Sequence, residues 1–247
     1  MGAVMAERRG STHTKRATYD LRHRIVQGEI PGGTRLYEVA LAEEMNISRT
    51  PVREAMSRLA EEGLLQRAPG GGFAVRSFTY RDVIDAIELR GVLEGTAARL
   101  AAERGADPGK LKEIKEISDE VDSFVWVAES ARDFDRYTEL NAAFHDALAA
   151  LCGSEIVQAE LRRVKSLPFS SPSAFVLGQA DGDAAHRAMI IGQTQHRALV
   201  EAIEAREGAR AEAIAREHAR IARENLDSFR NVGDSLESVP GLALIVD

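Results

Sequence analysis

The sequence has few of the residues that mark disulfide-rich, all-β or membrane proteins. It contains one cysteine, Cys152, and aromatic residues make up only 5% of its 247 positions. One cysteine excludes an intramolecular disulfide framework, and few aromatic residues beside many Ala, Leu, Glu and Arg predict a mainly α-helical fold. No apolar run approaches the roughly 18 residues that cross a bilayer, and Met1–Arg24 lacks the apolar stretch of a secretory signal. We therefore expect a cytoplasmic chain without a membrane partner.

The two parts of the chain differ in charge, although the whole carries a formal net charge of -7. Residues 1–80 hold 12 Lys and Arg against 9 Asp and Glu, a net charge of +3. The remaining 20 basic and 30 acidic residues give -10. Only the N-terminal part therefore suits the phosphate backbone of a nucleic acid.

Three short helices are predicted in the N-terminal part, because apolar residues recur at helical spacing. They cover Lys15–Gln27, Tyr37–Met45, and a segment from about Ser48 to Gly63. Ser48 or Thr50 is the expected N-cap of the third helix. Residues 1–14 show no periodicity and are expected to form a disordered arm.

A hairpin is predicted directly after the third helix. The short apolar runs Leu64–Leu65 and Phe73–Val75 flank the turn Pro69–Gly72, whose three glycines favour a tight tip. Three helices followed by a hairpin indicate a winged helix-turn-helix domain over residues 15–78.

The third helix is the candidate DNA-reading element, because the tight turn Asn46–Ser48 separates it from the second helix. Its N-terminal end carries hydroxyl groups for phosphate oxygens and guanidinium groups for guanine edges. The candidate DNA-binding residues are Arg35, Ser48, Arg49, Thr50, Arg53 and Gly71. The alternative is that Arg49 and Arg53 form a solvated face, with Arg53 paired to Glu54 or Glu38.

These segments resemble the GntR family of bacterial transcription regulators. The matching stretches are Gly28–Glu38, Leu41–Glu44, Ile47–Ala55, Arg58–Leu59 and Glu62–Leu64. The resemblance implies that Arg35, Arg49, Thr50 and Arg53 contact operator DNA, supported by the glycine-rich tip of the wing. It also implies a homodimer on a two-fold symmetric operator.

The rest of the chain is predicted to be an antiparallel helical bundle over residues 79–230, followed by a tail over residues 231–247. Every strong pattern there has helical period. The expected helices cover residues 80–104, 108–127, 131–151, 154–166, 183–206 and 208–229. In the tail, the apolar residues Leu242–Val246 could pack against a neighbouring part of the protein.

Three histidines and an amide fall on the inward faces of these bundle helices. Asn141 and His145 are one helical turn apart, and His196 and His218 lie on apolar stripes of the last two helices. Side chains from facing helices of a bundle often build a metal site, with Zn as the default and Ni, Co or Fe as alternatives. The other interpretation is that each histidine is a hydrogen-bonded core residue.

The bundle resembles the ligand-binding FCD domain of the FadR-type branch of this family, in which an acidic residue and three histidines hold a divalent metal. Glu88, Arg90 and Glu94 also resemble that domain. Asn141 departs from the common pattern, which has Asp at this position. Four neutral ligands leave the charge of the ion uncompensated, so we expect an anionic carboxylate or phosphate effector, with Arg90 as a second anchor.

The sequence therefore predicts a transcription repressor that reads operator DNA as a homodimer and responds to a small anionic effector. A metal-dependent hydrolase fused to a DNA-binding domain is the alternative from another class. A third alternative is an architectural DNA-binding protein that has no ligand-sensing domain. The acidic bundle with its inward-facing histidines argues against it.

Overall fold

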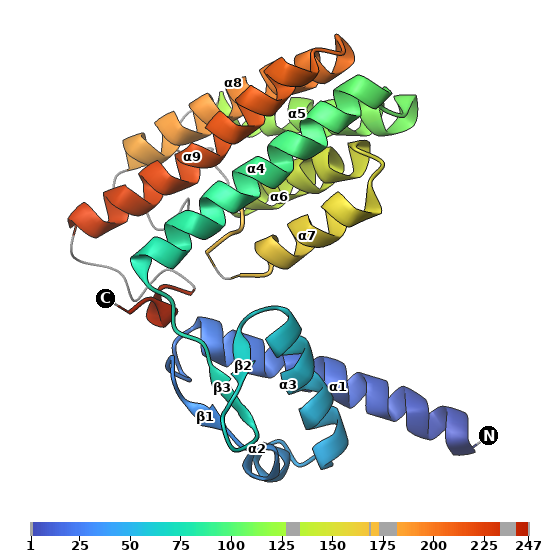
Figure 1. Cartoon of the computed structure of the whole chain (residues 1–247), viewed down its shortest axis with the longest axis vertical. Helices are drawn as coiled ribbons and strands as arrows, with labels where there is room; N and C mark the ends of the chain where they lie inside the picture. Colours follow the sequence, from blue (N-terminus) through green and yellow to red (C-terminus); the bar gives the residue numbers. More distant parts are fainter. Residues whose placement is uncertain (1, 127–133, 168, 173–181, 233–240, 247) are drawn as a thin grey trace. The chain divides into compact units, whose positions relative to one another are not determined.

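The computed structural model describes residues 2–126, 134–167, 169–172, 182–232 and 241–246. The chain forms two compact units. The first comprises Met1–Asp82 with Ser166–Pro168 and Leu236–Asp247, and the second comprises Val83–Lys165 with Phe169–Ser235. Both are built mainly of helices (Figure 1), which confirms the predicted fold class.

The N-terminal unit contains three helices and a small sheet. Its elements are α1 (Gly2–Val26), β1 (Arg35–Leu36), α2 (Glu38–Glu44), α3 (Arg49–Glu61), β2 (Leu65–Arg67) and β3 (Phe73–Val75). The sheet is antiparallel in the order β1-β3-β2. The hairpin of β2 and β3 is the predicted wing, and β1 is an added strand that the sequence did not predict because it is only two residues long.

Helix α1 begins at Gly2, whereas no regular structure was expected before residue 15. Its packed part is centred on Ala17, Leu21 and Ile25, which are buried at helical spacing. The preceding residues continue this helix because Ala, Met, Glu and Arg favour helix, even where no apolar stripe marks a face.

The predicted turn between α2 and α3 is present, and its backbone shows why it is tight. Asn46 adopts a left-handed conformation with φ 52°. The N–H of Ile47 donates to the carbonyl of Ala42 at 3.1 Å, and that of Asn46 donates to Glu43 at 3.2 Å. These two bonds satisfy the last carbonyls of α2 and redirect the chain into α3. Helix α3 then buries Val52, Ala55, Met56 and Leu59 on one face.

The segment 241–246 packs within the N-terminal unit. The N–H of Phe78 donates to the carbonyl of Leu244 at 2.8 Å, and the N–H of Val246 donates to Phe78 at 2.7 Å. The N–H of Gly241 donates to Val26 at 2.8 Å, and Leu244 is fully buried. This part of the predicted tail is therefore part of the first unit's core, while residues 233–240 lie outside the described residues.

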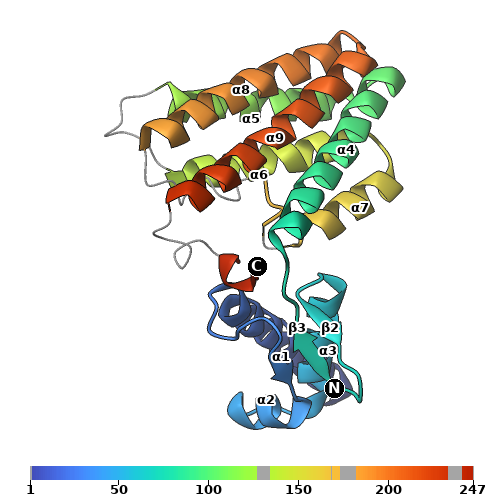
Figure 2. The ribbon, with the colours of Figure 1, turned by 60° about the vertical axis from the view of Figure 1, so that its left-hand side comes forward.

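The second unit is a helical bundle (Figure 2). Its helices are α4 (Tyr80–Arg104), α5 (Pro108–Val125), α6 (Phe134–Leu151), α7 (Glu155–Lys165), α8 (Gly182–Glu204) and α9 (Gly208–Val232). Helix α5 packs on α6 and α8, and α8 packs on α9. These bounds follow the six predicted helices, although the expected ends at residues 127 and 131 lie outside the described residues.

Local sequence signals explain where the bundle helices begin. The side chain of Asp107 accepts hydrogen bonds from the N–H groups of Gly109 and Lys110 at 2.9 and 3.0 Å, and Pro108 occupies the first turn of α5. The bundle core lies around Phe144, Leu148 and Leu199. None of the described helices combines the length and apolar character needed to cross a bilayer.

Candidate DNA interface and metal centre

The start of α3 is solvent-exposed and carries the residues proposed to read DNA. Ser48 is the N-cap by backbone conformation, and its hydroxyl makes no capping hydrogen bond. Ser48, Arg49, Thr50 and Arg53 are all exposed. The hydroxyl and guanidinium groups needed for phosphate and base contacts are thus accessible at this end of the helix.

Arg49 and Arg53, the two arginines in the N-terminal part of α3, converge on Glu38 at the start of α2. The Nε and Nη2 of Arg53 donate to the two carboxylate oxygens of Glu38 at 2.8 and 2.7 Å, and Arg49 Nη2 lies 3.6 Å from Glu38. The hydrogen bonds from Arg53 lower the pKa of Glu38. Both arginine side chains are 60% exposed. An exposed ion pair contributes little to stability, so this pairing can be exchanged for a phosphate or a base at small cost.

Arg35 and Gly71 lie on the wing side of the same unit. Arg35 is exposed on β1, and its Nη2 donates to the carbonyl of Pro69 at 3.3 Å. Gly71 has φ 98°, and no atom lies within 4 Å of the position that a Cβ would occupy. A tip without side chains that projects into open space can approach a narrow groove.

The second site is a cluster of three histidines from three helices, of which His145 and His196 are buried and His218 is half-buried. His145 on α6, His196 on α8 and His218 on α9 place their nearest ring nitrogens within 4.8 Å of one another. The Nε2 of His218 lies 3.2 Å from that of His196 and 3.2 Å from that of His145. The structure therefore brings together the three histidines that the sequence singled out.

Each of these histidines has its other ring nitrogen against an oxygen acceptor. Nδ1 of His145 lies 2.9 Å from Glu94 Oε1, Nδ1 of His196 lies 3.2 Å from Gln193 Oε1, and Nδ1 of His218 lies 3.0 Å from Gln195 Oε1. Carboxylate and amide oxygens are acceptors, so each Nδ1 carries the proton and donates it. Three unprotonated Nε2 atoms then face one centre, which is the arrangement that a metal ion requires.

Burial keeps these histidines in the neutral form that can bind a metal. Desolvation lowers the pKa of His145 and of His196, and it lowers that of His218 to about 3. Burial alone would raise the pKa of Glu94, but His145 and the guanidinium of Arg90 stabilise its carboxylate and hold the pKa well below its usual range. The cluster therefore combines neutral imidazoles with an ionised carboxylate behind one of them.

Asn141 and Arg90 line a cavity of about 20 Å³ beside His218. Asn141 is buried one turn before His145 on α6. Arg90 is 1% exposed on α4, its Nη1 lies 3.4 Å from Glu94, and its Nε has no hydrogen-bond partner among the described residues. A buried guanidinium N–H without a partner is costly, so it marks a place where an acceptor group is expected.

The sequence did not predict that Glu94, Gln193 and Gln195 hold the histidine rings. Glu94 was noted only through its resemblance to the FCD domain, and its contact with His145 was not foreseen. Gln193 and Gln195 gave no such signal, because a glutamine near a histidine in sequence is common in any exposed helix.

Comparison with known proteins agrees with this architecture. The family description "Bacterial regulatory proteins, gntR family" matches residues 13–75, and "FCD domain" matches residues 85–220. The chain therefore belongs to the GntR family of bacterial regulatory proteins, in the branch that carries an FCD domain. This establishes a transcription regulator with a DNA-binding winged helix-turn-helix, and it confirms the resemblance identified in the sequence.

Individual relatives are transcription repressors. The HTH-type transcriptional repressor RspR of Escherichia coli K12 is 30% identical over 195 residues, which cover 71% of this chain and 82% of that protein. The probable D-xylose utilization operon transcriptional repressor of Paenarthrobacter nicotinovorans is 37% identical over 111 residues, 43% of this chain and 49% of that protein. The chain thus spans about half the length of this relative.

A solved structure shows the same fold. E. coli McbR/YncC superposes with a TM-score of 0.61 at 22% sequence identity, covering 90% of this chain and 99% of that chain. At this identity the likeness concerns the fold alone.

Proposed function

We propose that this regulator is a repressor that leaves its operator when a small anionic metabolite binds beside a divalent metal in the bundle. The observation that carries the proposal is the histidine cluster, in which every Nδ1 is held by an oxygen and every Nε2 faces the same centre. A core of merely hydrogen-bonded histidines would not need three lone pairs to converge.

The proposed metal ligands are His145, His196 and His218, with Asn141 as a neutral fourth. Zn is the expected metal because nitrogen ligands in a tetrahedral arrangement suit it, and Ni, Co or Fe would suit the same donor atoms. A divalent ion would supply fixed positive charge that holds an anion in the pocket.

The charges around the cluster support an anionic effector. Arg90 and Glu94 carry opposite charges and lie 3.4 Å apart, so they largely cancel. The proposed ligands are all neutral, which leaves the charge of the ion to be compensated from outside the protein. A carboxylate or phosphate would provide this charge and also an acceptor for the unpartnered Nε of Arg90.

The size of the cavity connects effector binding to a change in the bundle. A volume of about 20 Å³ admits a water or one small head group but not a whole metabolite. A whole metabolite that occupied this cavity would therefore displace some of the side chains that line it. A ligand that binds the opened bundle better than the closed one shifts the equilibrium between them, which is how release from the operator would arise.

The proposed DNA contacts are Arg35, Ser48, Arg49, Thr50, Arg53 and Gly71, used by two copies of the chain on a two-fold symmetric operator. All six are exposed in the N-terminal unit. A homodimer doubles the number of base contacts that one short recognition helix can make.

The test is the metal content of the purified protein and of a double variant, His145→Ala with His196→Ala, measured by mass spectrometry after reconstitution. We expect about one metal per chain in the parent and none in the variant. Phe144 stacks on His196 within the same core, so circular dichroism must first show that the variant is folded. A parent protein that holds no metal after reconstitution with Zn, Ni, Co or Fe would overturn the proposal.

A further inference from the structure

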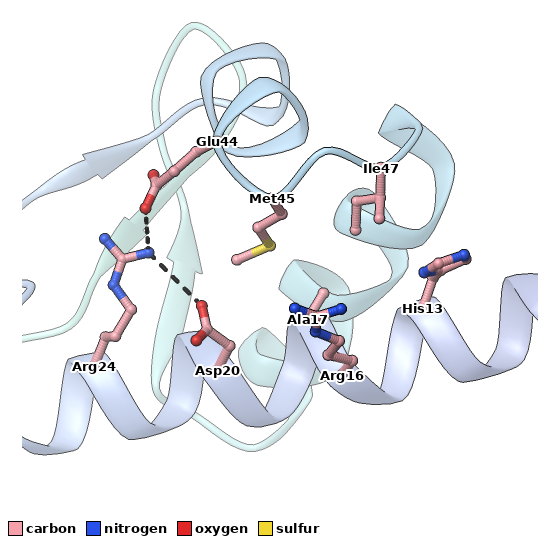
Figure 3. Close-up of a pocket in the computed structure, with 8 residues that line it drawn as sticks. All are labelled: His13, Arg16, Ala17, Asp20, Arg24, Glu44, Met45 and Ile47. Atoms are coloured by element: carbon pink, nitrogen blue, oxygen red, sulfur yellow. Dashed lines mark hydrogen bonds and ion pairs between the residues drawn. The ribbon is translucent and has the colours of Figure 1, made fainter.

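A groove lined by both basic and acidic side chains lies beside the turn that precedes α3, outside the proposed operator-reading residues (Figure 3). It has a volume of about 440 Å³ between α1 and the end of the α2 helix with the following turn. One wall of the groove is a single face of α1, formed by His13, Arg16, Ala17, Asp20 and Arg24. The opposite wall is formed by Glu44 at the end of α2 and by Met45 and Ile47 after it.

The two ends of this groove differ in charge. At one end Arg24 Nη1 lies 2.8 Å from Glu44 and 3.7 Å from Asp20, so its charge is compensated. At the other end are Arg16, which is exposed, and His13, which is half-buried. Neither side chain makes a hydrogen bond or ion pair within the described part of the chain, and Figure 3 draws no dashed line from either one.

The uncompensated end adjoins the helix proposed to enter the major groove. Ile47 lines the groove and stands two residues before Arg49, the first residue of α3. The major groove is about 12 Å wide and is bordered by phosphate ridges, so a side chain beside the first turn of a recognition helix meets a ridge. Lys15, the neighbour of Arg16 on α1, is also exposed and adds positive charge at this end of the groove.

We propose that Arg16 and His13 of α1 bind the phosphate backbone of DNA next to the recognition helix. This contact rests on the proposed operator binding and deepens it: α1 would fix how deeply and at what angle α3 enters the groove, without reading any base.

The experiment uses the full-length protein and two DNA probes, a random-sequence duplex and a duplex that the parent protein selects from a random library. Affinities are measured between about 50 and 200 mM salt. For Arg16→Gln we expect affinity for both duplexes to fall about 5-fold near physiological salt, and the slope of log affinity against log salt to decrease by about 0.9, the value for one phosphate contact. The preference for the selected duplex should stay as in the parent.

Matched variants separate charge from folding and from base reading. Arg16→Lys keeps the charge and should restore most of the slope, whereas Arg58→Gln removes the same charge from the last turn of α3 and should leave the slope unchanged. Arg49→Ala should lose the preference for the selected duplex, which tests the operator-reading assignment independently. If Arg16→Gln leaves the slope of log affinity against log salt unchanged, the α1 contact is overturned, whatever the result for Arg49→Ala. The random-sequence duplex measures this slope even if the protein shows no sequence preference.

Discussion

Asn141 is the residue whose chemistry most affects the charge of the proposed metal site. It is buried and lines the same cavity as Arg90 and His218. An amide oxygen is a weak, neutral ligand, whereas a carboxylate of nearly the same shape would add one negative charge. Whether position 141 holds Asn or Asp therefore decides whether the protein or the effector supplies the negative charge that balances the proposed metal ion.

Asn141→Asp should hold the metal more tightly and bind anions more weakly. The introduced carboxylate neutralises part of the positive charge that attracts the effector, so we expect the affinity for anions to fall by about 10-fold or more. Calorimetric titration of metal-loaded parent and variant with citrate and inorganic phosphate measures this. Equal anion affinity in two proteins with equal metal content would show that the anion does not sense the charge of the ion.

At the scale of single elements, the end of α3 shows how a glycine fixes the path from the recognition helix to the wing. Gly63 has φ 79°, its N–H donates to Ala60 at 3.1 Å, and the N–H of Leu64 donates to Leu59 at 2.9 Å. This pair of bonds closes the helix and sends the chain into β2. A Cβ at Gly63 would lie 2.9 Å from Leu167 Cδ2, so the position is restricted by space as well as by backbone conformation.

Gly63→Ala should therefore lower the free energy of unfolding by about 2 kcal/mol, from left-handed strain together with the contact to Leu167. Gly70→Ala is the matched control, because Gly70 has φ 85° but open space around its Cβ position. Gly70→Ala should lower the free energy of unfolding by only about 1 kcal/mol, from the left-handed backbone conformation alone. Urea denaturation of the three proteins gives the comparison, and a Gly63 variant no less stable than the Gly70 variant would contradict the contact argument.

Helices and turns whose position is set by neighbouring residues were predicted from the sequence. Contacts between residues far apart in the sequence were not. Periodicity, Gly63 and the Asp107–Pro108 pair locate helix faces and ends, because each acts within a few residues. The sequence also singled out the three histidines, through their spacing and their resemblance to a known domain. It could not show that Glu94, on another helix, holds the ring of His145, since such a contact depends on how α4 packs against α6.

In the metal-free state the whole bundle should respond to pH through its histidine cluster. The pKa of His218 is about 3 in the folded protein, against a usual value near 6.5 in an unfolded chain. Between these values the unfolded chain binds a proton that the folded protein does not, so stability rises with pH and is lost as pH falls below about 6.5. His145 and His196 shift in the same direction and add to the effect.

We expect the free energy of unfolding of the EDTA-treated protein to fall between pH 7.5 and 5, with up to about 1.4 kcal/mol per pH unit for each histidine that titrates only when unfolded. Urea denaturation at several pH values measures this slope. His218→Gln should reduce the slope by up to one proton, because glutamine does not titrate. A slope that is the same in parent and variant would mean that His218 is already protonated, or exposed, in the folded bundle.

The pairing of Phe78 with Leu244 and Val246 also has a consequence for biosynthesis. During translation, Val26 and Phe78 leave the ribosome long before residues 241–246 are made, so the core of the winged helix-turn-helix is incomplete until those residues emerge. The winged helix-turn-helix is thus completed by residues that follow the whole helical bundle in the sequence. A nascent chain stalled before Gly241 would expose that apolar gap, and a bulky insertion directly after Val246 would disturb the winged helix-turn-helix, although the two are far apart in the sequence.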